Sequence, residues 1–133
     1  METGIVKLTP ELLALIGTGG VDALAPFSRE IYLLDIVVAG TTFCTEMDKL
    51  EPELLPETVL KMIRQPQNKH DELAIGIYFN GTRVGWVPME HNEVISRLMD
   101  AGKAFFCRIE STKRKGNWVK IKAKIFMVEW ISR

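Results

Sequence analysis

Alternation of hydrophobic and polar residues is clearest near the end of the chain, over residues 118–131 (WVKIKAKIFMVEWI). Because successive side chains of a strand point to opposite faces, a period of two predicts a β-strand. A strand of this length should bend or take part in two sheets. The hydrophobic side holds Val119, Ile121, Ala123, Ile125 and Met127, and the polar side holds Lys120, Lys122 and Lys124.

Shorter segments with strand-like patterns occupy 31–39, 58–64, 74–79, 82–87 and 104–111. The first of them, IYLLDIVVA, is rich in β-branched and bulky residues, which predicts a buried strand. Asn80 and Gly81 separate the third segment from the fourth. Both residues tolerate the positive φ angles of a type I′ turn, so 74–87 predicts a hairpin.

Helical patterns are fewer. Residues 91–101 (HNEVISRLMDA) place Val94, Ile95, Leu98 and Met99 on one face, and a glycine follows where a helix would end. A second helix is predicted over 9–17, with a Thr at the N-cap and a Pro at the first helical position. Residues 41–57 are expected to be irregular or to form a short helix.

Six strands and few helices predict a mainly β (α+β) fold, either a small barrel or a sandwich. A length of 133 residues fits one domain. With 47% hydrophobic residues, the chain can bury a core without a disulfide or a structural metal.

Charge and cysteine content narrow the possible functions. The net charge is zero, which argues against a protein that coats nucleic acid by charge alone. The distribution is uneven, because 46–57 is mostly acidic whereas 113–124 holds six cations and no acid. Cys44 and Cys107 lack metal-ligand spacing, so both are expected to be reduced and buried in a cytoplasmic protein. No apolar stretch has the length of a membrane span, and the first residues do not resemble a signal peptide.

A polar loop, PQNKHDELAI at 66–75, runs directly into an apolar segment. Two readings of Asn68 and Asp71 are open. Their side chains either hydrogen-bond within their own turn or are presented at the rim of a binding site. The readings are compatible, since a self-bonded loop is also a rigid one.

The segments RQPQNKHDELAI (64–75) and NGTRVGWVP (80–88) together resemble the HIRAN family. The following helix, EHNEVISRLMDAGK, is similar to that of stand-alone bacterial members, and the resemblance covers 31–130. It implies a six-stranded OB-like β-barrel with one or two helices. From the segment Pro26-Phe27-Ser28, which ends the opening section, we expect 1–28 to be an N-terminal helical extension and 29–133 to be the barrel domain.

The resemblance also implies a non-catalytic DNA-binding module. HIRAN domains fused to helicase-like repair ATPases capture the 3′-hydroxyl end of single-stranded DNA. By position, Asp71 would accept a hydrogen bond from the terminal hydroxyl, with Asn68 beside it, and Phe43 would stack on a base. The whole predicted DNA-binding set is Thr41, Thr42, Phe43, Arg64, Asn68, Lys69, His70, Asp71 and Trp86.

DNA-binding members of the family carry an Arg and two aromatic residues after the first strand, where this chain has Thr41-Thr42-Phe43. The missing charge would have to come from Arg64, Lys69 or a secondary basic patch. Cations on the outer face of a strand are usually only solvated. In this patch, however, Trp118 lies between the cations, as aromatic residues do in barrels that bind single strands. The patch consists of Lys113, Arg114, Lys115, Lys120, Lys122 and Lys124.

Other interpretations remain open. Trp86 is expected to be a core residue, whereas Phe43 fits either a core or a stacking role. One alternative function is a protein-interaction module on the same barrel that has lost DNA binding. A weaker alternative is a metal-dependent phosphoesterase using His70, Asp71 and His91, although the carboxylate clusters of such enzymes are missing. No cofactor is expected. Predicted partners are single-stranded DNA or DNA ends and a helicase or nuclease protein, in DNA repair or mobile-element processes.

Overall fold

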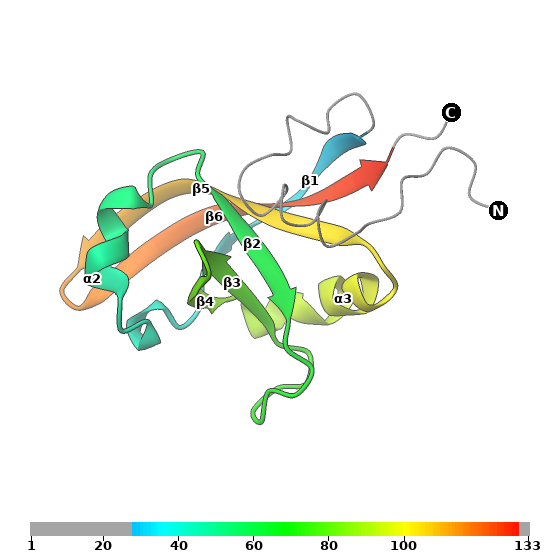
Figure 1. The fold of residues 1–133 in the computed structure, drawn as a ribbon, viewed down its shortest axis with the longest axis horizontal. Coiled ribbons are helices and arrows are strands. Elements are labelled where there is room, and N and C mark those ends of the chain that lie inside the picture. Colours follow the sequence, from blue (N-terminus) through cyan, green and yellow to red (C-terminus); the bar gives the residue numbers. More distant parts are fainter. Residues whose placement is uncertain (1–27, 131–133) are drawn as a thin grey trace.

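One antiparallel sheet of six strands dominates the part of the chain that the structure describes (Figure 1). The structure is a computed structural model, and it describes residues 28–130. Short helical segments η2 (Thr41–Phe43), α2 (Met47–Leu50) and η3 (Glu51–Glu53) follow the first strand, and α3 (Met89–Asp100) follows the fourth. The strands are β1 (Ser28–Val37), β2 (Val59–Arg64), β3 (Ile75–Phe79), β4 (Thr82–Trp86), β5 (Ala104–Lys115) and β6 (Trp118–Trp130), in the spatial order β1-β6-β5-β2-β3-β4.

The long hairpin β5–β6 runs the length of the domain (Figure 1). Its alternation is as predicted, with Val119, Ile121, Ala123 and Ile125 buried. β6 lies within one sheet rather than two. It accommodates its length through register shifts against β1, between Tyr32 and Leu34, and against β5, between Ile109 and Ser111. Such bulges bend a strand and increase its twist, which lets the sheet curl.

The curled sheet nearly closes on itself. Just past β1, the N–H of Ala39 donates to the carbonyl of Trp86 at the end of β4, and the N–H of Trp86 donates back, both at 2.8 Å. We call this junction the seam. Gly85 makes it possible, because a Cβ there would lie 2.5 Å from the Ala39 carbonyl oxygen. The arrangement confirms the predicted OB-like fold of six strands, in which the sheet itself is not closed.

The predicted hairpin and helix are both present. Asn80 and Gly81 have φ angles of 49° and 82°, as a type I′ turn between β3 and β4 requires. The buried face of α3 differs from the prediction, because Val94 is 68% exposed. Ile95 is buried together with the polar residues Asn92 and Ser96, and Leu98 and Met99 are partly buried against the core.

Two further predictions of burial, for β1 and for Cys44, were wrong. β1 is an edge strand, so Tyr32 and Leu33 on it are exposed, while Ile36 faces the core. Cys44 is only half-buried, whereas Cys107 is buried, and both are free. In the described part of the chain, no helix is long and apolar enough to cross a membrane. The predicted helix at 9–17 and the extension 1–28 lie outside the described residues, apart from Ser28 at the start of β1.

Candidate functional site

A groove of about 670 Å³ opens beside the seam. Its walls come from η2, the polar loop between β2 and β3, the end of β4 and the first turn of α3. The loop projects from the body of the barrel (Figure 1). Strand pairing at the seam therefore brings together segments that are far apart in the sequence. The groove is lined by Ala39, Gly40, Phe43, Asn68, His70, Asp71, Ala74, Arg83, Trp86, Val87, Met89 and Asn92.

The polar loop is held by its own side chains. Asn68 Oδ1 accepts hydrogen bonds from the backbone N–H groups of His70 (2.9 Å) and Asp71 (3.1 Å). Asp71 Oδ1 accepts from the N–H of Leu73 at 2.9 Å. Both of these side chains also line the groove. The two readings of Asn68 and Asp71 thus coexist, because the bonds that fold the loop also fix these groups at the rim.

Asp71 has a second anchor outside the loop. Asn92 Nδ2, from α3, donates to Asp71 Oδ2 at 2.7 Å. Each carboxylate oxygen thus has one hydrogen bond, and each can accept another. Asp71 is therefore an oriented acceptor with spare capacity.

Arg64 fixes the base of the loop instead of lining the groove. Its guanidinium donates to the carbonyls of Ala74 (2.7 Å) and Glu72 (3.0 Å) and to the carboxylate of Asp100 (2.9 Å). The hydrogen bond from Arg64 holds the pKa of Asp100 below its usual value. Because these bonds occupy the guanidinium, Arg64 is poorly placed to supply the cation that was expected of it in the binding site.

Two aromatic side chains face the groove. Phe43 is 77% exposed. Trp86 is half-buried and is not the core residue predicted from its strand, because its ring forms a groove wall. Trp86 Nε1 donates to Gln65 Oε1 at 3.1 Å, which fixes the ring edge. Gly40 lies against the ring with φ of 71°, and a Cβ there would lie 2.8 Å from it.

Arg83 is a groove residue that sequence reasoning missed. Its guanidinium carbon lies 4.4 Å from the centroid of the Trp86 ring. In a regular strand, residues three apart point to opposite faces. The register shift in the β3–β4 pair puts Arg83 and Trp86 on the same face. No ion pair of Arg83 occurs within residues 28–130.

Met89 and Asn92 were missed as well. Met89 is an exposed apolar side chain at the first position of α3. Asn92 could have been noticed, since it is a polar residue on the same helical face as Ile95 and Ser96. A buried polar side chain on such a face calls for a hydrogen-bond partner, which here is Asp71.

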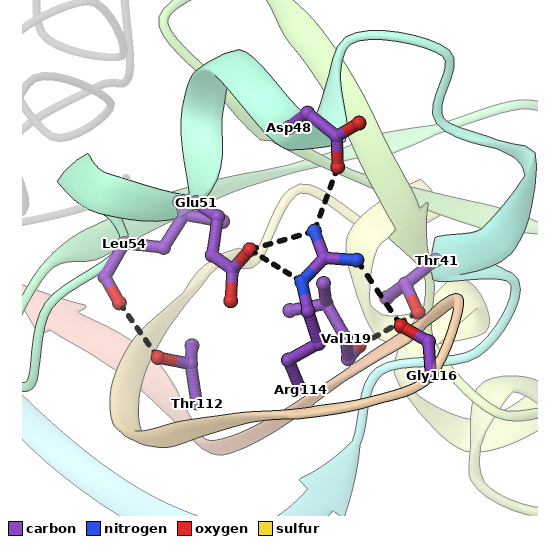
Figure 2. Close-up of polar contacts among 8 residues, drawn as sticks. All are labelled: Thr41, Asp48, Glu51, Leu54, Thr112, Arg114, Gly116 and Val119. Carbon is purple, nitrogen blue, oxygen red and sulfur yellow. Dashed lines mark hydrogen bonds and ion pairs between the residues drawn. The ribbon is translucent and has the colours of Figure 1, made fainter.

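Thr41 and Thr42 lie next to a different, smaller cavity of about 200 Å³, together with Cys44, Asp48 and Arg114 among others. Thr41 is buried, and its Oγ1 donates to the carbonyl of Val119 at 2.8 Å (Figure 2). This bond ties η2 to β6. Thr41 is therefore a structural support for η2, which carries Phe43 into the groove.

The two histidines and Lys69, which were all candidate site residues, do not lie together in the groove. His70 lines the groove, whereas His91 and Lys69 are exposed and do not. Among the residues that the structure describes, no group of three His, Cys, Asp or Glu side chains is arranged to hold a metal ion. His70, Asp71 and His91 thus do not form the site that the phosphoesterase hypothesis requires.

The secondary basic patch falls into two groups, residues that form salt bridges with described acidic side chains and residues that do not. Arg114 binds Asp48 and Glu51, both at 2.7 Å, which raises its pKa (Figure 2). Lys124 binds Asp35 (2.9 Å) and Glu110 (3.2 Å), and Lys122 lies 3.9 Å from Glu110. By contrast, none of the described acidic side chains forms a salt bridge with Lys113, Lys115 or Lys120.

The fold and groove define a small, partly open β-barrel with a groove at its seam, bordered by aromatic rings, a fixed carboxylate and a cation. The sequence matches the HIRAN domain family over residues 31–129, and the chain belongs to this family. HIRAN domains are DNA-binding modules, so membership supports a nucleic-acid-binding role.

Two solved structures are similar to this one. A crystal structure of a protein from Lactobacillus plantarum has a TM-score of 0.70 at 16% identity, covering 77% of this chain and 98% of that chain. The HIRAN domain of human HLTF has a TM-score of 0.61 at 17% identity, covering 77% of this chain and 80% of that chain. These similarities concern the fold. A search among curated proteins gave no match.

Proposed function

We propose that this protein is a non-catalytic module that binds single-stranded DNA and reads its 3′-hydroxyl end in the groove, in DNA repair or mobile-element processes. One observation carries the proposal: the Asp71 carboxylate is fixed by Leu73 and Asn92 in the same groove as the exposed ring of Phe43. A base and a terminal hydroxyl could therefore be bound together.

Each groove residue has a distinct part in this proposal. Phe43 and Trp86 offer ring surfaces for the terminal bases, and such stacking contributes about 1–3 kcal/mol per base. Arg83, which forms no described ion pair, supplies a cation for a backbone phosphate and takes the role first considered for Lys69 and Arg64. Asn68 uses its oxygen within the loop, which leaves its amide N–H groups as donors toward the ligand.

Asp71 would give the selectivity for the end. An ionised carboxylate only accepts hydrogen bonds, so it can bind the hydroxyl of a free 3′ end. A 3′-phosphate at the same place would bring two negative charges together and would be repelled. Cleavage or unwinding would be the work of a partner protein, such as a helicase or a nuclease.

Fluorescence anisotropy would test the proposal with two labelled strands of the same sequence, one ending in a 3′-hydroxyl and the other in a 3′-phosphate. Asp71→Asn removes the charge while keeping the shape of the side chain. Glu72→Gln removes the same charge from the neighbouring exposed residue, which does not line the groove. All titrations would be done at one low salt concentration, since affinity for nucleic acid depends on salt.

We expect the wild-type protein and Glu72→Gln to bind the hydroxyl strand more tightly than the phosphate strand, and Asp71→Asn to lose this preference. Equal binding of both strands by the wild-type protein would show that the groove does not read ends. Failure of both strands to bind would instead favour the protein-interaction module on the same barrel.

A further inference from the structure

The groove adjoins the long hairpin through residues 38–39, the segment between β1 and η2 that forms the seam. β1 pairs with β6 up to Val37 and Lys122, and the next residue, Val38, donates its N–H to the carbonyl of Ile121 at 2.9 Å. Continuing this register places Ala39 beside Lys120. Ala39 is bridged to Trp86 on its other side. Lys120 and Trp86 are thus two strand spacings apart, or about 10 Å between backbones.

The same register decides which face these side chains share. Val38 and Ile121 are buried in the core, so their sequence neighbours Ala39 and Lys120 point outward. Trp86 is opposite Ala39 and lies on this outer face with Arg83. On β5, Lys113 is paired with Lys120 and Lys115 is paired with Trp118, so these residues extend the same face toward the hairpin tip.

The part of the hairpin nearest the groove differs from the rest in that its lysines lack acidic partners among the described salt bridges. Lys113 and Lys120 are direct cross-strand partners, and like charges in that position are destabilising. Neither has an acidic partner in the described salt bridges, whereas Lys122 and Lys124, further along β6, do. Arg114 faces the other side of the hairpin and is held by Asp48 and Glu51 (Figure 2). Uncompensated positive charge therefore gathers on the stretch that leads from the groove.

An aromatic ring lies within this stretch. The ammonium group of Lys115 is 5.9 Å from the ring centroid of Trp118. Cations interleaved with an aromatic ring are how barrels follow a single strand, with phosphates on the cations and a base on the ring. A duplex keeps its bases stacked on each other, so Trp118 would have no base to receive from it.

We infer that a track made of Lys120, Lys113, Lys115 and Trp118 binds the nucleotides that precede the terminal ones, so that a single strand runs from the groove onto the hairpin. This inference rests on the proposed function, because the groove sets where the strand ends. It adds a second contact region and makes affinity depend on strand length.

The test compares 3′-hydroxyl strands of four and twelve nucleotides, both of which lie within the site sizes of about 4–16 nucleotides found for such barrels. The track variant is Lys113→Gln/Lys120→Gln. The control variant, Lys49→Gln/Lys103→Gln, removes two charges from exposed residues that lie on α2 and just past α3. A twelve-base-pair duplex with a four-nucleotide 3′ overhang serves as the third probe.

We expect the track variant to bind the four-nucleotide strand as the wild-type protein does, which also shows that it is folded. Its affinity for the twelve-nucleotide strand should fall severalfold. The slope of log affinity against log salt should fall by about 1.4, since each phosphate contact on a single strand contributes about 0.7. The control variant should change neither quantity, and Trp118→Ala should weaken only the longer strand.

Three results would overturn the track. In the first, the wild-type protein binds both strands equally well. In the second, the control variant loses as much affinity for the longer strand as the track variant. In the third, the track variant loses affinity for the duplex probe but not for the longer single strand. In each of these cases the four-nucleotide strand still binds, so the result counts against the track and not against the groove. Failure of the wild-type protein to bind any probe, or equal binding of the 3′-hydroxyl and 3′-phosphate strands described above, would count against the proposed function itself.

Discussion

Asn92 donates a hydrogen bond to Asp71 at 2.7 Å and so ties the first turn of α3 to the polar loop. Asn92 is 3% exposed. The position of the carboxylate in the groove is therefore set by a helix as well as by the loop that carries it. Removing this link should affect both the stability of the domain and the proposed recognition of a DNA end.

Asn92→Ala should lower the free energy of unfolding by about 1–3 kcal/mol, because a buried hydrogen bond to a charged group is lost. Chemical denaturation would measure this. Glu93→Ala is the control, since within residues 28–130 the Glu93 side chain forms only an exposed salt bridge with Arg97, and its removal should change stability by less than about 1 kcal/mol. An equal effect of the two variants would contradict a structural role for the Asn92–Asp71 bond.

Asn92→Asp should be more damaging, because it places two carboxylates within hydrogen-bond distance. Protonation of one of them relieves the repulsion, so the folded state of this variant takes up a proton more readily than the unfolded state. Its loss of stability relative to wild type should be greater at about pH 7 than at about pH 4. A deficit that does not change between these pH values would argue against the pairing.

Gly40→Ala tests the contact between the start of η2 and the Trp86 ring. The left-handed conformation alone should cost about 1–2 kcal/mol. Gly116→Ala measures that cost separately, because Gly116 has φ of 62° and open space around it. We expect the Gly40 variant to lose clearly more stability in denaturant titrations, since a Cβ would meet the ring at 2.8 Å. Similar losses would show that the ring moves aside without cost.

Arg64→Lys should loosen the polar loop, because one ammonium group cannot bind Ala74, Glu72 and Asp100 in the geometry of the guanidinium. Limited trypsin digestion followed by mass spectrometry would show faster cleavage after the exposed Lys69. Cleavage within 113–115 at the hairpin serves as an internal reference. Arg97→Lys, at a salt bridge between exposed side chains, should leave the rate at Lys69 unchanged.

The two cysteines should differ in reactivity. Burial raises the pKa of Cys107 to about 12 and excludes reagents from it, whereas Cys44 is only half-buried. Titration with a disulfide reagent at about pH 8 should therefore modify one thiol in the folded protein and a second only after denaturant is added. Rapid modification of Cys107 in buffer would contradict the packing of β5.

Local sequence patterns predicted the secondary-structure elements well where their conformation depends on residues that are close together in the sequence. The positive φ angles of Asn80 and Gly81 and the alternation in β6 depend on residues that are neighbours in the chain. The position of β1 at the sheet edge depends on strand order, which no local pattern contains. This is why Tyr32 and Leu33 were expected to be buried although they are exposed.

The same distinction applies to the groove. The family motif identified Phe43, Asn68 and Asp71, and all three line it. Arg83 was not predicted, because a register shift against β3 decides on which face of β4 it lies. Trp86 was assigned to the core because its pairing with Ala39 joins segments that are far apart in the sequence. Arg64 and Arg114 were predicted to be available to DNA, but each is bound by carbonyl or carboxylate groups from other segments of the chain, which the local sequence does not reveal.

The seam has a consequence for how the domain opens. The hydrogen bonds between Ala39 and Trp86 join the two ends of the open sheet, and both residues also line the groove. Separating β4 from the chain after β1 breaks fewer backbone bonds than separating any of the paired strands, so this is where partial unfolding should begin. A ligand in the groove would contact both sides of the seam, since Ala39 and Trp86 both line it, and would therefore stabilise the paired seam. The free energy of ligand binding would then add to the stability of the paired seam. Amide hydrogen exchange at Ala39 and Trp86 should therefore slow as more of the groove is occupied by ligand.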